Sequence, residues 1–175
     1  MFSIAISSVL CLVILTNKLY KTEHTYESLI AVFIAVTNTI AAILEADNLM
    51  ESKCLTAVIS IDLNDLKRLN DENGHAAGDT ALCTIVACIQ NILPRGCHLY
   101  RTGGDEFMIL CSRVSKDYVP ALIDHMRREL SKTPYCCAIG FATSDADEDF
   151  EHICSIADAA MYANKKQLKS EDTIR

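Results

Sequence analysis

Two glycines followed by two acidic residues separate two strand-like stretches near the middle of the chain. Residues 98–102 precede the Gly-Gly-Asp-Glu segment at 103–106, and the apolar stretch 107–111 follows it. Because glycine reaches positive φ without steric cost, the pair predicts a tight β-hairpin with both glycines at the turn. Asp105 and Glu106 would then be raised where they could hold a divalent cation against a phosphate. A surface hairpin with solvated acids is the alternative, and the segment alone favours it.

Length and charge narrow the class of protein. The chain has 175 residues, and its formal net charge is -7. This length suits one globular domain with an appendage. An acidic chain without a Lys/Arg cluster is not expected to bind the phosphate backbone of a nucleic acid. We therefore expect no nucleic-acid partner, and any bound nucleotide should be a small molecule held through a metal ion.

The nine cysteines contain no C-x-x-C pair, which argues against a zinc site. An odd number of cysteines dispersed through apolar stretches, such as residues 81–85, is typical of thiols that act as small core hydrophobes in a reducing compartment. We therefore expect the main domain to lie in a cytoplasm.

Residues 1–16 carry no charge and are apolar apart from three serines and a threonine. A spanning helix needs about 20 apolar residues, and the basic start of a signal peptide is missing. We interpret residues 1–19 as a hydrophobic segment and a candidate membrane anchor, with residues 1–16 as its apolar part. The alternative is a helix that packs on the domain or on a partner chain. Lys18 and Lys21 favour a cytoplasmic location for the rest of the chain.

A second apolar run covers residues 29–44, but it contains Thr37, Asn38 and Thr39 and ends in an acidic-polar stretch. These features predict an amphipathic or largely buried first helix of the globular domain rather than a second membrane span. We place the domain at residues 20–175.

Downstream, strand-like and helix-like stretches are intermixed. The β-branched run at 55–61 predicts a buried strand that ends at Asp62, and a turn is expected at 73–74. Helices are expected over residues 65–70, 79–93, 118–130 and 150–168, and a further strand over 136–142. The pattern predicts an α+β fold, an α/β sandwich in which helices cover a mostly antiparallel central sheet.

Asp62 is a second acidic site at the end of a strand, in addition to Asp105 and Glu106. If the two strands lie side by side in one sheet, the two sites could share a metal ion. Three blocks, residues 60–79, 101–107 and 157–165, resemble GGDEF-domain diguanylate cyclases. The resemblance spans roughly residues 26–169. It implies a domain similar to the palm of nucleotide polymerases and nucleotidyl cyclases. It also implies condensation of two GTP molecules into cyclic di-GMP, with release of two pyrophosphates, by an antiparallel homodimer in which each domain holds one GTP.

The resemblance implies the metal and catalytic residues. Asp62 and Asp105 would ligate Mg²⁺ or Mn²⁺, and the carbonyl group of Leu63 would complete the protein ligands. Asp105 and Glu106 would be the catalytic acids, with Glu106 needed for activation of the 3′-hydroxyl or for the metal.

The resemblance also implies two positions that read guanine, Asn70 and Asp79. A carboxylate can accept from the guanine N–H groups, while an amide can meet its acceptor edge. Without the neighbouring blocks, a helix cap and a turn residue would be the preferred interpretation.

Phosphate contacts are implied at five positions. The backbone N–H groups of Asp65 and Leu66 lie at the start of a short expected helix, where the helix dipole favours anions. Lys67 and Lys165 would add positive charge, and Lys169 stands where the family commonly has arginine.

Two departures from the family pattern matter. The motif with which domains of this family usually begin is largely lost at residues 27–35. This loss affects the link between the domain and any upstream segment. Pro94 and Cys97 occupy the positions of an inhibitory Arg-x-x-Asp, so we expect no product-inhibition site.

The leading interpretation is an active cyclase in a bacterial cytoplasm, at the inner face of the cell membrane. The alternative is a catalytically silent GTP-binding or dimerising module with a regulatory role.

Overall fold

The structure is a computed structural model that describes residues 26–144 and 149–173. The interpretation of residues 1–19 therefore lies outside the described residues. None of the helices in the described part combines the length and the apolar character that a transmembrane span requires. The elements in chain order are α2 (Tyr26–Glu51), β1 (Leu55–Leu63), α3 (Leu66–Asn73), α4 (His75–Gln90), β2 (Cys97–Arg101), β3 (Glu106–Ser112), a 3-10 turn (Lys116–Tyr118), α5 (Val119–Leu130), β4 (Cys137–Thr143) and α6 (Phe150–Thr173).

The four strands form one antiparallel sheet in the order β2-β3-β1-β4, which confirms the predicted α+β class. Strand β1 lies between β3 and β4, and Asp62 is paired in register with Glu106. The two acidic sites found in the sequence therefore meet on neighbouring strands.

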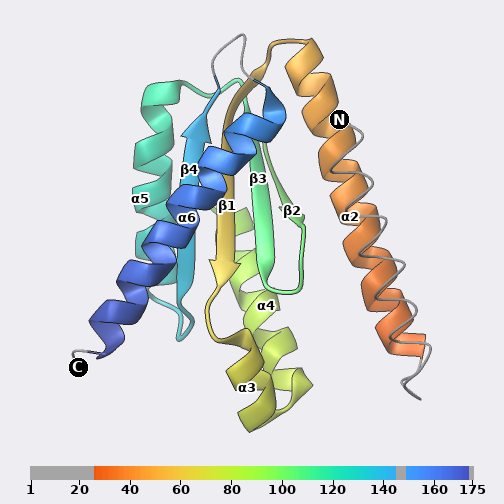
Figure 1. Cartoon of the computed structure of the whole chain (residues 1–175), viewed down its shortest axis with the longest axis vertical. Coiled ribbons are helices and arrows are strands. Elements are labelled where there is room, and N and C mark those ends of the chain that lie inside the picture. Colours follow the sequence, from red (N-terminus) through yellow and green to blue (C-terminus); the bar gives the residue numbers. More distant parts are fainter. Residues whose placement is uncertain (1–25, 145–148, 174–175) are drawn as a thin grey trace.

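Alternate residues of β1 face two different layers of helices. One set is buried in a cluster with side chains of α4 and α5: Ala57, Ile59, Ile61 and Leu63. Val58 is buried in the opposite cluster, which includes side chains of α2 and α6. Because strand side chains alternate, Ser60 and Asp62 lie on the α2 and α6 face. Figure 1 shows α6 crossing over β1 and β4, with α2 beside the sheet.

Gly140 allows α6 to lie directly on β4. A Cβ atom at Gly140 would lie 2.0 Å from the backbone nitrogen of Met161, a separation that real Cβ atoms do not show. The N–H of Ile139 also donates a hydrogen bond of 2.9 Å to Oδ1 of Asn164 on α6. These contacts fix the position of α6, and with it the side chains that α6 presents to β1.

Helix α2 contains the helix predicted over residues 29–44. Its small residues Ala42 and Ala46 are buried, so the backbone of α2 comes close to the domain. The hydroxyl of Tyr100 on β2 donates a hydrogen bond to Glu45, which ties α2 to the edge of the sheet. Burial raises the pKa of Tyr100, and the hydrogen bond to Glu45 adds to this, so the hydroxyl stays protonated and able to donate.

Several element boundaries differ from the prediction. The first strand continues to Leu63, and Asp62 is therefore inside it. The helix expected over residues 79–93 begins earlier, at His75, and ends at Gln90. Gly74, with φ of 82°, separates it from α3, which confirms the predicted turn.

The expectation that the cysteines are core hydrophobes holds only in part. Cys97 and Cys111 are buried and paired across β2 and β3, but Cys83 and Cys136 are exposed. The apolar neighbours of Cys83 misled the prediction because they lie on the other face of α4.

Candidate functional site

The hairpin is present, but its loop is wider than a two-residue turn. Strand β2 ends at Arg101 and β3 begins at Glu106, while the N–H groups of Thr102 and Gly103 both donate to the Glu106 carbonyl, at 3.0 and 3.2 Å. Neither Gly103 nor Gly104 lies in the left-handed region. The expectation of positive φ at both glycines is therefore wrong, because four loop residues reverse the chain without it.

A side chain at Gly103 would instead crowd the side chain of Glu106. A Cβ atom there would lie 2.6 Å from Oε2 of Glu106, whereas a Cβ at Gly104 would meet nothing within 4 Å. The guanidinium of Arg101 holds the loop by donating to the carbonyls of Gly103 (3.2 Å) and Gly104 (2.6 Å). Arg101 is a positioning residue that sequence reasoning did not assign. Its signal was a cation two residues before the glycine pair.

Asp62 is the buried charge of the site. It is 5% exposed, and the Lys165 ammonium donates to both of its carboxylate oxygens, at 2.6 and 2.7 Å. The adjacent Leu63 donates its N–H to the carbonyl of Asp105 at 2.9 Å, so the end of β1 is fixed to the hairpin loop. The structure thus brings together Asp62, Leu63, Asp105 and Lys165.

Glu106 lies in an acidic environment. Partial loss of hydration raises the pKa of its carboxyl group, and the charges of Asp105, Asp62 and Asp158 raise it further, while Lys165 opposes them. Within residues 26–144 and 149–173, the carboxyl group of Glu106 has no hydrogen-bond partner. A carboxylate with a raised pKa and no partner is suited to accept a proton or a cation.

Asp158 is a member of this acidic group that sequence reasoning did not assign. The hydroxyl of Ser60 on β1 donates to its Oδ1 at 2.6 Å. The residue was inside the third sequence block, and seven positions separate it from Lys165, which places both on one side of α6.

The start of α3 has the geometry expected of an anion site. Asp65 precedes the helix with φ of 58°, in the left-handed region, and its side chain does not cap the helix. A non-glycine residue in this conformation stores strain of about 1–3 kcal/mol, a feature common at ligand sites. Leu66 begins the helix and Lys67 is exposed beside it. The first N–H groups of a helix have no partner inside it and can meet a phosphate.

The predicted guanine-reading residues lie where α3 meets α4. Asn70 Oδ1 is buried and has no hydrogen-bond partner in the described part of the chain. A Cβ at Gly78 would lie only 2.0 Å from that oxygen, so the Asn70 amide packs directly on the α4 backbone, one residue before Asp79. Asp79 itself is exposed. An unpartnered buried acceptor beside an exposed carboxylate is consistent with a polar ligand at this corner.

The donor set at the end of β1 suits a hard divalent cation. Among the described residues, no three His, Cys, Asp or Glu side chains form a metal-binding group. The predicted set needs only two carboxylates, Asp62 and Asp105, and the Leu63 carbonyl, which are oxygen donors of the kind Mg²⁺ and Mn²⁺ prefer. The Lys165 ammonium forms an ion pair with Asp62, so this carboxylate already binds a cation. The donor set therefore fits Mg²⁺ or Mn²⁺. Lys169 lies one turn further along α6 and is exposed.

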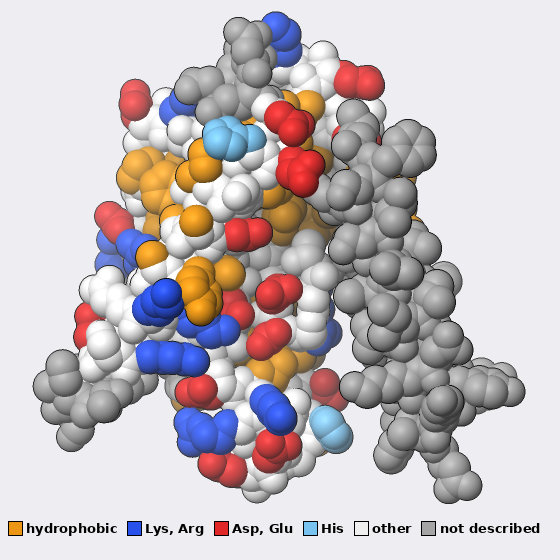
Figure 2. All heavy atoms as spheres, in the orientation of Figure 1, with side chains coloured by type: hydrophobic (Ala, Val, Ile, Leu, Met, Phe, Trp, Pro, Cys, Tyr) orange, Lys and Arg blue, Asp and Glu red, His pale blue; other side chains and the backbone are white. Residues whose placement is uncertain are grey.

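The distribution of charged side chains can be followed on the face of the molecule that carries α6. Figure 2 shows acidic side chains along the middle of the face, and basic side chains mixed with acidic ones lower, around α3 and the C-terminal part of α6. The arrangement suits an anionic ligand that reaches the acidic center through a cation.

Comparison with known proteins identifies the family. The model of the diguanylate cyclase GGDEF domain matches residues 35–171. The chain therefore belongs to the GGDEF-domain diguanylate cyclase family.

Individual relatives agree with this assignment. The diguanylate cyclase DgcM of Escherichia coli K12 is 27% identical over 115 residues, which cover 62% of this chain and 28% of that protein. A diguanylate cyclase of Vibrio cholerae is 28% identical over 116 residues, covering 62% of this chain and 36% of the relative. The chain thus spans about a third or less of the length of these relatives.

Solved structures share the fold. The GGDEF domain of YfiN (TpbB) from Pseudomonas aeruginosa is 30% identical, with a TM-score of 0.59, over 69% of this chain and 82% of that one. The GGDEF domain of DgcB from Caulobacter crescentus, solved in complex with c-di-GMP, has a TM-score of 0.63 at 23% identity, over 70% of this chain and 76% of that one.

Proposed function

We propose that the chain is a diguanylate cyclase that condenses two GTP molecules into cyclic di-GMP and releases two pyrophosphates. The observation that carries the proposal is the ammonium of Lys165 on both oxygens of the buried Asp62. A buried carboxylate that already holds a cation, next to Asp105 and Glu106, is what a metal-assisted phosphoryl transfer needs. The family assignment and the strained start of α3 support the same function.

The phosphates and the guanine of GTP would be bound by two different sets of residues. Asp62, Asp105 and the Leu63 carbonyl would hold Mg²⁺ or Mn²⁺ at the end of β1. Such an ion, when bound, would neutralise charge on the triphosphate and lower the pKa of the attacking hydroxyl. Asn70 and Asp79 would bind guanine at the corner between α3 and α4.

Lys165 would exchange partners during binding. In the structure it neutralises Asp62. With a divalent ion held by Asp62, the Lys165 ammonium would be able to contact the phosphates, together with Lys67, Lys169 and the N–H groups of Asp65 and Leu66. The exchange keeps the buried carboxylate compensated at every stage, which avoids the cost of an unpaired buried charge.

Glu106 would take the proton of the attacking 3′-hydroxyl or contribute to the metal. Its raised pKa brings the carboxylate closer to the pH at which a general base works well. Attack on the α-phosphorus of a second GTP requires a second domain, since one domain holds one GTP, so the active species would be an antiparallel homodimer.

A catalytically silent GTP-binding or dimerising module is the second candidate. The loss of the opening motif at residues 27–35 favours it, because that segment forms the start of α2 and would affect how two domains are paired.

The full chain incubated with GTP and Mg²⁺, with mass spectrometric detection of cyclic di-GMP, tests the proposal. We expect product that depends on Mg²⁺ and on protein concentration, and none from Asp105→Ala. GTP binding without product at high protein concentration would instead favour the silent module.

A further inference from the structure

A cavity of about 640 Å³ lies between α2 and α6, with β1 and β3 as its floor. This is within the range of small-molecule sites, about 300–1,000 Å³. The residues assigned above to metal, phosphate and guanine do not line it, with the exception of Glu106. The cavity is therefore a separate space that shares one carboxylate with the candidate catalytic hairpin.

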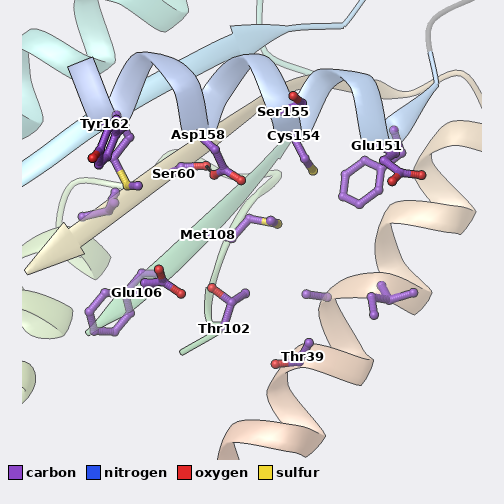
Figure 3. Close-up of a pocket in the computed structure, with 16 residues that line it drawn as sticks. Thr39, Ser60, Thr102, Glu106, Met108, Glu151, Cys154, Ser155, Asp158 and Tyr162 are labelled. Atoms are coloured by element: carbon purple, nitrogen blue, oxygen red, sulfur yellow. Dashed lines mark hydrogen bonds between the residues drawn. The ribbon is translucent and has the colours of Figure 1, made fainter. Parts of the chain in front are cut away.

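Most of the cavity wall is apolar. Figure 3 shows Met108 on the floor and Cys154 on the α6 side, and Ile43, Phe150 and Met161 also line the space. Burial raises the pKa of the Cys154 thiol to about 12, so this side chain stays neutral and belongs to the apolar wall. Such a surface favours the body of an organic molecule over a hydrated inorganic ion.

The charged side chains among the described lining residues are acidic. Glu106 and Asp158 point into the space from β3 and α6, and Glu151 lies further along α6 (Figure 3). Among the residues that the structure describes, no Lys, Arg or His lines the cavity. Asp158 receives one hydrogen bond, from Ser60, and the carboxylate of Glu106 receives none from the described residues. Glu106, Asp158 and Glu151 are exposed, so a cation that enters the cavity from solvent can reach their carboxylates.

We propose that this cavity binds a small organic cation, an apolar body that carries a protonated amine, with the amine between Glu106 and Asp158. Apolar walls alone would accept a neutral molecule, and the acidic pair alone would accept a metal ion. Apolar walls together with the acidic pair favour a molecule that has both an apolar body and an ammonium group. Because Glu106 also belongs to the candidate catalytic hairpin, such a ligand would withdraw it from the reaction and inhibit cyclisation. This last consequence rests on the proposed cyclase function.

The methionines of the chain provide a direct test. Met108 and Met161 line the cavity, while Met126 is fully buried on the opposite face of the sheet. The full chain with carbon-13 methionine methyl groups is titrated with phenylbutylammonium and, separately, with the neutral phenylbutanol and the anionic phenylpentanoate. We expect saturable shifts of Met108 and Met161 with the ammonium, at least about tenfold weaker binding of the alcohol, and no shift of Met126.

Asp158→Asn keeps an acceptor for Ser60 but removes the charge, and we expect it to weaken the ammonium about tenfold without changing binding of the alcohol. Asp124→Asn, an exposed aspartate on α5, is the matched control and should leave all binding unchanged. Cys154→Phe, which fills part of the space, should weaken both probes. Equal binding of the three probes, shifts that include Met126, or no shift at Met108 and Met161 would overturn the proposal.

The two claims fail separately. Methionine shifts in a chain that makes no cyclic di-GMP would leave the cavity ligand supported and the proposed cyclase function wrong. Product formation that is unchanged at saturating phenylbutylammonium would overturn the inhibition.

Discussion

The end of β1 and the corner between α3 and α4 are proposed to hold opposite ends of one nucleotide, yet they differ in how their polar groups are paired. At the end of β1, the buried Asp62 is already bound by Lys165. At the corner, Asn70 keeps a buried oxygen without a partner in the described residues. The Asp62 carboxylate is thus compensated without a ligand, whereas the Asn70 oxygen would gain a partner only from a ligand.

The difference follows from the elements that carry the residues. Asp62 is inside the central strand, where register with β3 and contact with α6 fix its surroundings. Asn70 and Asp79 lie on two helices that meet through Gly74 and Gly78. We therefore expect ligand binding to stabilise α3 and α4 more than the sheet, while metal binding mainly exchanges one cation for another.

The largest effect should come from removing the internal cation. Lys165→Met leaves Asp62 buried without a partner, and breaking such a pair costs about 3 kcal/mol. The free energy of unfolding, from urea denaturation in metal-free buffer, should fall by about this amount, and Mg²⁺ should restore part of it. Lys166→Met, an exposed neighbour on α6, is the control. Equal stability of the two variants would show that the pair is not a structural element.

A smaller effect is expected at the guanine end. In Gly78→Ala the new Cβ would lie 2.0 Å from Asn70 Oδ1, so the Asn70 amide must leave its position against α4. Overpacking of this kind costs about 1–3 kcal/mol. GTP binding, measured by calorimetry, should weaken at least about tenfold while Mn²⁺ binding stays the same. A parallel loss of Mn²⁺ binding would show that the two ends are not independent.

The hairpin glycines make a matched pair. Gly103→Ala pushes against the Glu106 carboxylate, 2.6 Å away, whereas Gly104→Ala enters open space. We expect Gly103→Ala to lower the rate of cyclic di-GMP formation about tenfold, since the carboxylate must move, with little change in unfolding. Gly104→Ala should keep most of the activity. The reverse order of the two rates would contradict the assigned position of Glu106.

The smallest effect concerns pH. The folded protein raises the pKa of Glu106, so the folded state binds this proton more tightly than the unfolded state does. Its favourable contribution is present below the unfolded pKa and is lost as the pH rises through the folded pKa. Glu106→Gln should therefore raise the melting temperature slightly at neutral pH and leave it unchanged in acid. A variant that is less stable at neutral pH would contradict the raised pKa.

Much of the fold could be predicted because it depends on local pattern. The apolar run at 55–61 and the glycine pair identified β1 and the hairpin, and the polar residues 37–39 placed α2 in the domain. The conformation of Gly103 and Gly104 was wrong, since it depends on loop length, which residue type alone does not determine.

The site could be predicted only as a set of residues. The pair between Asp62 and Lys165 joins positions 103 apart in the chain, and it depends on where Gly140 lets α6 lie on β4. The contact between Asp158 and Ser60 has the same origin. No pattern along the sequence reports such distances, so the partner of Asp62 and the acidic surroundings of Glu106 required the structure.

Mn²⁺ titration followed by electron paramagnetic resonance tests most directly whether Lys165 holds the place of a divalent ion on Asp62. Three proteins are compared: the unmodified chain, Lys165→Met and Asp62→Asn. We predict tighter Mn²⁺ binding in Lys165→Met, because the ion no longer competes with the ammonium, and loss of binding in Asp62→Asn. Unchanged Mn²⁺ binding in Asp62→Asn would contradict the account.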